Sequence, residues 1–516
     1  MRGAAASAPP SRPRGAPRLL RAPASARRRL PRFPPRGGSA RPRRLAPAAA
    51  SRIAPPPAHD PSTGAPRALF VFGLGYTSLG LANVLLRAGW RVSGTVRDAE
   101  RAASLAARGV DAHVWRPDDG VALRPDALDA LRDATHVLNS VPPVADFDRD
   151  PVLADPACVA ALREKLEAVD AALAAAGPGK GNVVVHAAGD DDSAAIIPLR
   201  WLGYLSSTSV YGDAGGAWVD ETTRGLAPTA PKAVARLDAE NAWRAFFAGR
   251  RGAGREGKGT LLRVFRLGGI YGPGRSALEA ARRDAARLEA SETAEGRGEK
   301  VLLPPREGDR AAERRDPKRR TSTAPGEPGG GAGFEPSPRA SRRFTSRCHV
   351  GDVVATLCAS IRAEAEAEAG EGEGEGAAGR DDFVEADGST GRTYNVVDDA
   401  PAPRREAMAY AARLLAGGVV DDGAPGAEDG AGIRIRGAGA AGEDGRARTA
   451  ECGREGGPGA AKNTTRGSGG GGVAEKRVRN DRIKRELGVR LMFPTYREGL
   501  AAIARGDATP FGADER

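Results

Sequence analysis

One stretch of this chain has the residue types and spacing of a phosphate-binding turn. Gly73-Leu74-Gly75-Tyr76-Thr77-Ser78 follows an apolar run and precedes apolar residues at helical spacing. Gly73 permits a tight turn, and Gly75 lets the backbone approach a pyrophosphate that rests on the N-terminus of the helix. Ser78 replaces the third glycine of the usual fingerprint and is still small. We therefore predict a dinucleotide site at Gly73, Gly75, Tyr76, Thr77 and Ser78; the alternative is a strand–turn–helix without ligand.

The end of the next expected strand discriminates between the two nicotinamide cofactors. An NAD site has a carboxylate about 20 residues after the glycines, which holds the ribose 2′-hydroxyl. This chain has Gly94-Thr95-Val96-Arg97 there, and a guanidinium can pair with the 2′-phosphate of NADP. We therefore predict NADP, bound near Thr95 and Arg97. NAD is the alternative, in which Asp98 holds the ribose and Arg97 faces solvent.

A further expected strand ends in Ser140-Val141-Pro142-Pro143. Ligands of open parallel sheets gather beyond the carboxyl ends of the strands, at the point where strand order reverses. We expect Ser140 and Pro142 to shape the nicotinamide side of the site. His113, His136 and His186 have no metal-ligand spacing, so no metal site is assigned.

The elements that must position these residues alternate regularly from residue 68 onward. Apolar strands alternate with segments of helical periodicity, such as residues 231–247, which predicts an α/β fold with a parallel sheet covered on both faces. This is a doubly wound, Rossmann-type arrangement. No stretch approaches the roughly 20 apolar residues that span a bilayer, so we expect no membrane span.

Charge is distributed unevenly along the 516 residues. The formal net charge is +12, but residues 1–66 alone contain 14 Arg and one acid, so the remainder is nearly neutral. The body therefore gives no electrostatic reason to expect a nucleic-acid partner. A leader rich in Arg, Ala, Pro and Ser is typical of an organelle transit peptide. Its many prolines disfavour a long amphipathic helix, so we predict a chloroplast protein, with the mitochondrion as the alternative and an ordinary basic tail as the plainer interpretation.

Three stretches have too few large apolar side chains to pack a core. They are residues 279–340, the acidic repeat near 363–379, and residues 421–474. We predict disordered insertions there, the first and third separating domain segments. The expected organisation is a leader at 1–66, a dinucleotide-binding domain at 67–278, its continuation with a small C-terminal lobe at 341–420, and a helical end of that lobe at 475–510.

Several motifs together resemble the extended short-chain dehydrogenase/reductases. They are YLSSTSVYGDAGGAWVDE, RLDAENAW, FRLGGIYGPGR and RCHVGDV, and the C-terminal segments YNVVDD and KRVRNDRIKRELGVRLMFPTYREGL are similar too. The chain is most similar to the atypical NAD(P)-dependent epimerase/dehydratase-like group that includes YeeZ-type proteins. The resemblance covers most of residues 68–505 outside the insertions.

The resemblance implies hydride transfer at a carbonyl or carbinol carbon, with a Tyr-x-x-x-Lys pair and a Ser/Thr handling the proton. Ser207 matches the Ser/Thr position, and Thr208 is next to it. The helix register places Lys232 at the Tyr position and Arg236 at the Lys position. The chain thus departs from the family at its acid/base pair. We take Ser207, Thr208, Lys232 and Arg236 as the catalytic candidates.

The resemblance therefore implies an NAD(P)-binding oxidoreductase or epimerase acting on a small polar metabolite. Its C-terminal lobe would bind the substrate, and it would form a homodimer. The alternative is a catalytically reduced NADP-binding protein that serves as a redox sensor or assembly factor, favoured by the replaced pair. His349 and Asp352 match a family motif between the cofactor and substrate lobes, where Asp352 could instead cap a helix.

Overall fold

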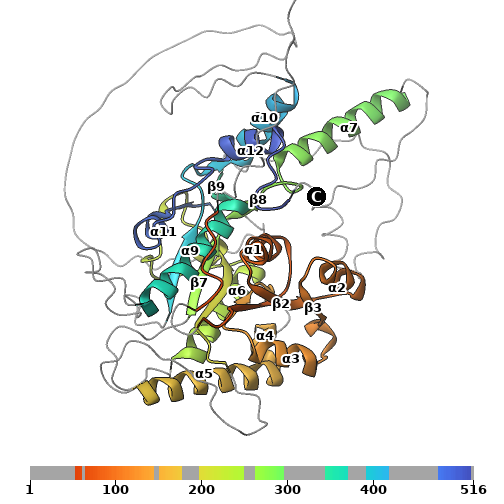
Figure 1. The fold of residues 1–516 in the computed structure, drawn as a ribbon. Coiled ribbons are helices and arrows are strands. Elements are labelled where there is room, and N and C mark those ends of the chain that lie inside the picture. The colour runs from red at the N-terminus through yellow and green to blue at the C-terminus, as the bar shows by residue number, and fades with distance from the viewer. Residues whose placement is uncertain are drawn as a thin grey trace, which may run out of the picture. The chain divides into compact units, whose positions relative to one another are not determined.

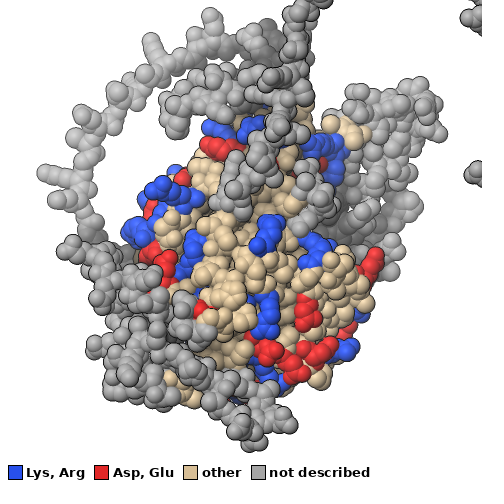
Figure 2. Space-filling view, viewed as in Figure 1, with Lys and Arg blue, Asp and Glu red and all other residues tan. Residues whose placement is uncertain are grey.

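The computed structural model describes residues 53–60, 64–143, 150–176, 197–248, 262–295, 343–369, 391–417 and 475–512. Most of the predicted leader, the insertion at 421–474 and His186 lie outside these described residues. Within them, no helix is long and apolar enough to cross a membrane. On the face drawn in Figure 2, basic and acidic side chains both occur across the described surface.

A seven-stranded sheet in the order β11-β7-β5-β4-β1-β2-β3 forms the centre of the fold. All six pairings are parallel. The strands are β1 (Ala68–Phe72), β2 (Arg91–Val96), β3 (Asp111–Val114), β4 (His136–Asn139), β5 (Trp201–Ser207), β7 (Leu262–Leu267) and β11 (Arg392–Val396). The strand order reverses between β1 and β4, which is the switch point at which such sheets bind ligands. The predicted Rossmann-type fold is confirmed.

The sheet is buried on both faces, which explains why β1 is apolar at every position. Leu69 and Val71 face one core, with α1 (Tyr76–Arg87), α2 (Ala99–Ala106) and α9 (Val350–Ala369). Phe70 and Phe72 face the other core. The helices on that side are α3 (Pro125–Arg132), α4 (Pro151–Ala154), α5 (Pro156–Ala176) and α6 (Pro231–Phe247).

A small lobe stands beyond the sheet. Its core includes Leu278, Tyr410 and Leu500 from three helices, which lie together at the top of Figure 1, away from α3 and α5. The helices are α7 (Ala277–Glu295), α10 (Arg404–Leu415) and α12 (Tyr496–Ala504). Two pairs of short strands join the lobe to the sheet. In one, β8 (Gly269–Tyr271) pairs with β10 (Arg347–His349), and in the other, β9 (Phe344–Thr345) pairs with β12 (Ala402–Pro403). The loop after β5 contributes a short helix η2 (Thr208–Tyr211) and β6 (Trp218–Val219), which pairs with β13 (Arg477–Val478). Helix α11 (Asp481–Glu486) follows β13.

Three predicted boundaries differ from the structure. The predicted insertion at 363–379 begins inside α9, which extends to Ala369 and buries Ala365. The end of the predicted leader packs on the body: Ile53 is 2% exposed within the sheet core, and Asp60 forms an ion pair with Arg200 at 2.5 Å. The predicted insertion at 279–340 begins with ordered helix, because α7 extends to Glu295 and buries Leu278 against the small lobe. The remainder of that insertion lies outside the described residues.

Candidate dinucleotide site

The glycine turn, residues 73–78, joins β1 to α1 with the geometry that its motif predicts. Gly73 has φ +82°, a backbone conformation that residues with a side chain rarely adopt. A Cβ at this position would lie 3.1 Å from the Val141 side chain. Gly75 is the N-cap of α1, and a Cβ there would meet no heavy atom within 4 Å. The hydroxyl of Ser78 accepts from the Gly75 N–H at 2.9 Å and donates to the Gly73 carbonyl at 2.8 Å. The turn is therefore closed internally, and its Gly75 side is open to a ligand.

The N-terminus of α1 has the electrostatics of an anion site. Its first turn contains no acidic residue, so the positive end of the helix dipole is not compensated within the helix. Ser140 reinforces the turn from the end of β4, since its hydroxyl donates to the Gly73 carbonyl at 2.5 Å and lies 3.3 Å from the Ser78 hydroxyl. Pro142 is exposed two residues later.

Thr95 supports the turn from behind. It is 2% exposed, its hydroxyl accepts from the Gly73 N–H at 2.9 Å, and its carbonyl accepts from the Leu74 N–H at 2.8 Å. The Thr95 side chain therefore supports the turn, and a direct contact of Thr95 with the cofactor stays a prediction. The hydroxyl is already engaged with the backbone that would hold the pyrophosphate.

Arg97 lies where a 2′-phosphate ligand is expected, immediately after β2. Its guanidinium is 70% exposed and forms an ion pair with Asp118. Arg116 donates to the Arg97 carbonyl at 2.6 Å, which brings a second guanidinium side chain to the same edge. Asp98, the alternative ribose ligand, accepts from the Arg101 N–H as the N-cap of α2. Among the described residues, the basic groups at this edge are thus partly offset by Asp118.

A cleft of about 340 Å³ opens in front of the turn and is called the carboxyl-edge cleft below. One side is formed by the α1 N-terminus with Ser140, and the other by the ends of β5 and β7. Its lining residues are Gly75, Tyr76, Thr77, Ser78, Ser140, Leu205, Ser206, Ser207, Arg236, Leu267, Gly268, Gly269, Ile270 and Arg275. The charged residues among them are both arginines, so the cleft favours an anionic ligand.

Two of the four catalytic candidates line this cleft. Ser207 is at the end of β5, where its hydroxyl accepts from the Ser209 N–H at 3.1 Å. Arg236 approaches from α6 and donates to the Leu205 carbonyl at 2.7 Å. Thr208 is buried in η2, and Lys232 is exposed in the first turn of α6; neither is among the lining residues. The structure thus brings together Ser207 and Arg236 but not Lys232 and Thr208.

A buried charge network beneath the cleft was missed by sequence reasoning. Glu240 is fully buried and pairs with Arg266 at 2.7 Å, and the Ser206 hydroxyl donates to the same carboxylate at 2.5 Å. Arg266 also lies 4.9 Å from the ring centre of Tyr211, whose hydroxyl donates to Asn395 at 2.8 Å. One signal could have found this network, because β7 is a buried strand that nevertheless contains two charges, Arg263 and Arg266.

His349 and Asp352 lie between the sheet and the small lobe, and neither reaches the cleft. The Asp352 carboxylate accepts from the Met492 N–H at 2.6 Å and from the Phe493 N–H at 3.3 Å, and so ties the C-terminal region to α9. The His349 ring packs 4.0 Å from Phe493, and its Nδ1 accepts from the Gly351 N–H at 3.1 Å. Burial raises the pKa of Asp352 to about 7 and lowers the pKa of His349 to about 4.

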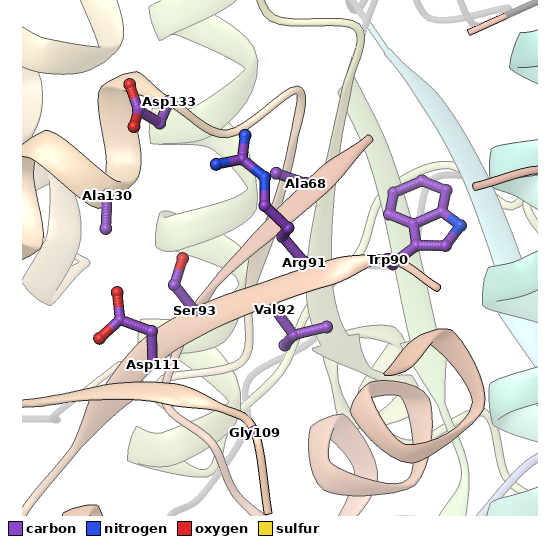
Figure 3. A pocket seen from close by; sticks show the side chains of 9 residues that line it. All are labelled: Ala68, Trp90, Arg91, Val92, Ser93, Gly109, Asp111, Ala130 and Asp133. Atoms are coloured by element: carbon purple, nitrogen blue, oxygen red, sulfur yellow. The ribbon is translucent and has the colours of Figure 1, made fainter. Parts of the chain in front are cut away.

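A second cleft of about 340 Å³ lies at the opposite, amino edge of the sheet. Figure 3 shows Arg91 and two carboxylates, Asp111 and Asp133, around it. Arg91 and Asp111 are the first residues of β2 and β3, whereas ligands of open parallel sheets bind at the carboxyl ends. The carboxyl-edge cleft is therefore the candidate site.

Comparison with known proteins agrees with the motifs. The chain is 28% identical to Protein YeeZ of Escherichia coli K12 over 207 residues, which are 40% of this chain and 59% of YeeZ. This similarity confirms the expected YeeZ-type resemblance. The match spans about three fifths of the length of YeeZ, and no family model matches the chain.

Two solved structures are among those that match the chain. A functionally unknown conserved protein from Silicibacter pomeroyi DSS is 27% identical, with a TM-score of 0.43 over 85% of this chain and 98% of that chain. A putative NAD-dependent epimerase/dehydratase from Methylobacillus flagellatus is 18% identical, with a TM-score of 0.40 over 85% and 98%.

Proposed function

We propose that this chain binds a nicotinamide dinucleotide in the carboxyl-edge cleft and transfers hydride to or from a small polar metabolite. The observation that carries the proposal is the glycine turn, which presents the uncompensated N-terminus of α1 to the cleft. Among the described residues, the charged side chains that line this cleft are Arg236 and Arg275. A dinucleotide pyrophosphate matches both features. Similarity to YeeZ and the short-chain dehydrogenase/reductase motifs support the same assignment.

The cofactor would supply or accept the hydride, and the chain's own residues would orient the substrate oxygen. Because the Ser207 hydroxyl accepts from the Ser209 N–H, its own hydrogen can point to a carbonyl oxygen in the cleft. Arg236 brings a fixed positive charge to the same region and would stabilise negative charge that develops on that oxygen. Ser207→Ala should therefore lower turnover while leaving the dissociation constant of the cofactor unchanged.

NADP is the cofactor that Arg97 favours. A charge-assisted contact with the 2′-phosphate contributes about 1.5–3 kcal/mol, which is roughly a tenfold or greater preference. Asp118 competes for the same guanidinium. We expect NADPH to bind more tightly than NADH, Arg97→Ala to remove the difference, and Asp118→Asn to enlarge it.

The test is a titration of residues 51–516 with NADPH and with NADH, followed by nicotinamide fluorescence. The assignment to NADP would be overturned if NADPH and NADH bound equally well to the wild type, to Arg97→Ala and to Asp118→Asn. The proposed function would be overturned if the wild type bound neither dinucleotide. Gly75→Val is the control for the binding site. Its Cβ would lie more than 4 Å from every described heavy atom, so the side chain should fill the open face over the turn and block the dinucleotide.

A second candidate is a catalytically reduced NADP-binding protein that acts as a redox sensor or assembly factor. The favouring observation is that Lys232 stands at the family's Tyr position and is exposed outside the cleft lining. Tyr76 is the one tyrosine among the lining residues, and its hydroxyl donates to the Pro273 carbonyl at 2.9 Å. Tight NADPH binding without oxidation by a panel of small aldehydes, ketones and keto acids would favour this candidate.

A further inference from the structure

The C-terminal segment, residues 507–512, packs directly on the helix that opens the dinucleotide site. The Phe511 ring lies 5.0 Å from the ring of Tyr76, the first residue of α1. The Pro510 carbonyl accepts from Arg87 in the last turn of the same helix at 3.2 Å. The segment therefore contacts α1 at both ends, more than 400 residues away in the sequence.

Close packing between these contacts shows that the segment is seated along the helix. A Cβ built on Gly80 would lie 2.7 Å from Pro510 Cγ and 3.7 Å from the Phe511 ring. On the neighbouring helix α9, a Cβ on Gly351 would lie 3.1 Å from Thr509 Cγ2. Glycine thus permits the segment to lie against both helices.

Tyr76 connects this segment to the opposite wall of the cleft. Its hydroxyl donates to the Pro273 carbonyl, and the Arg275 guanidinium lies 5.6 Å from its ring centre. Arg275 and the adjoining loop line the carboxyl-edge cleft together with Tyr76. One side chain therefore joins the glycine turn, the loop after β8 and the C-terminal segment.

From these contacts we infer that Phe511 is a positioning residue for the dinucleotide. It holds Tyr76, and through it the first turn of α1, in the orientation that receives the pyrophosphate. The inference rests on the proposed function, because it assigns the C-terminal segment a role in the affinity of the same site. Phe511 itself is not among the residues that line the cleft.

The first test compares Phe511→Ala with Phe246→Ala by NADPH titration and thermal unfolding. Phe246 is a partly buried aromatic on the other face of the sheet, 6.0 Å from Trp243. Phe511→Ala should weaken NADPH binding severalfold, because Tyr76 loses the ring that packs on it, and Phe246→Ala should leave binding unchanged. Phe511→Tyr should restore binding. Equal loss of affinity in both alanine variants, or none in Phe511→Ala, would overturn the inference.

Gly80→Ala tests the same contact from the helix side. Alanine has the higher helix propensity, by about 1 kcal/mol, but its Cβ would also lie 3.1 Å from Val354 Cγ2 on α9, so thermal unfolding is measured beside binding. The added methyl would displace Pro510, and the inference predicts weaker NADPH binding together with faster hydrogen exchange of residues 509–512. Unchanged affinity with a displaced segment would contradict it.

Hydrogen exchange at the start of α1 separates this inference from the proposed function. The Leu79 N–H donates to the Gly75 carbonyl at 2.9 Å, the bond that closes the first turn of α1. Phe511→Ala should speed exchange at residues 76–80 without any cofactor present. If the wild type binds no dinucleotide, the proposed function fails, but faster exchange would still show that Phe511 holds the turn. Unchanged exchange would refute the positioning role.

Discussion

At the scale of single residues, the site is held by groups that do not face a ligand. Thr95 matched a cofactor-contact position in the sequence, yet its hydroxyl accepts from the Gly73 N–H and is buried. Gly73 and Gly75 could be recognised in the sequence because a tight turn requires the backbone conformations that glycine adopts. The direction of the Thr95 side chain could not, because it depends on which neighbouring strand passes behind the turn.

Thr95→Val should weaken both the fold and the cofactor site. Valine keeps the shape but leaves the Gly73 N–H without its acceptor, and an unsatisfied buried donor costs about 1–3 kcal/mol. We expect the free energy of unfolding in urea to fall by that amount and the affinity for NADPH to fall several-fold. Thr95→Ser, which keeps the hydroxyl, should stay closer to the wild type in both. A valine variant with unchanged stability would show that the hydroxyl does not support the turn.

Glu240→Gln should be among the most destabilising single substitutions near the site. The variant removes the charge that compensates Arg266, which is 5% exposed, and breaking a buried pair costs about 3–5 kcal/mol. The measurement is urea unfolding, and the double variant Glu240→Gln with Arg266→Met is the control. The double variant should recover part of the loss, because the unpaired Arg266 charge is gone, whereas Arg244, which lies 4.0 Å from the same carboxylate, remains in both variants. A double variant less stable than the sum of the two single changes would contradict this account.

At the scale of elements, periodicity predicted most of the fold. The expected helix at 231–247 coincides with α6, and the apolar run beginning at Ala68 is β1. Such segments bury one face or both, so the spacing of their apolar residues indicates whether they form a helix or a strand. The misses occur where composition was used instead of pattern. The described residues 53–60 and 64–66 are rich in proline and small residues, and their packing depends on contacts with Trp90 and Arg200 that are remote in the sequence.

The segment 53–66 should stabilise the body measurably. Ile53 is buried in the sheet core, the Pro56 carbonyl accepts from the Trp90 ring N–H at 3.2 Å, and Asp60 pairs with Arg200. Burial of the Ile53 side chain alone contributes about 1.5–3 kcal/mol. A chain of residues 51–516 should therefore melt several degrees higher than one of residues 67–516. Equal melting temperatures would show that the segment contributes nothing.

The same segment limits where a leader can end. We propose that the leader is a chloroplast transit peptide and that it ends before Ile53, because cleavage near Ala68 would remove these contacts. A fluorescent fusion of residues 1–52 should direct a reporter to the chloroplast, and the N-terminal residue of the imported full chain should precede Ile53. Retention of the reporter in the cytosol would contradict the targeting proposal. An N-terminus at or beyond Ile53 would contradict the boundary.

At the scale of the whole molecule, two buried groups connect the sheet to the small lobe and respond oppositely to pH. The His349 pKa falls from 6.5 to about 4 on folding, so between these values the unfolded chain binds a proton that the folded chain does not. Its contribution to stability therefore rises with pH across that window. The Asp352 pKa rises from 3.8 to about 7, so the folded chain binds the extra proton, and its contribution falls as pH rises.

The two effects can be separated by substitution. Each pKa unit corresponds to about 1.36 kcal/mol, so either contribution changes by about 3–4 kcal/mol across its window. The stability advantage of the wild type over His349→Gln should grow from pH 4 to pH 6.5, and its advantage over Asp352→Asn should shrink from pH 4 to pH 7. Asparagine can still accept from the Met492 N–H, so the Asp352→Asn variant should fold. Urea unfolding at half-unit pH steps gives both differences. Differences that do not vary with pH would mean that neither group changes its protonation on folding. The junction between the lobes would then be held by packing of the His349 ring against Phe493 and by the hydrogen bonds from the Met492 and Phe493 N–H groups to the Asp352 side chain.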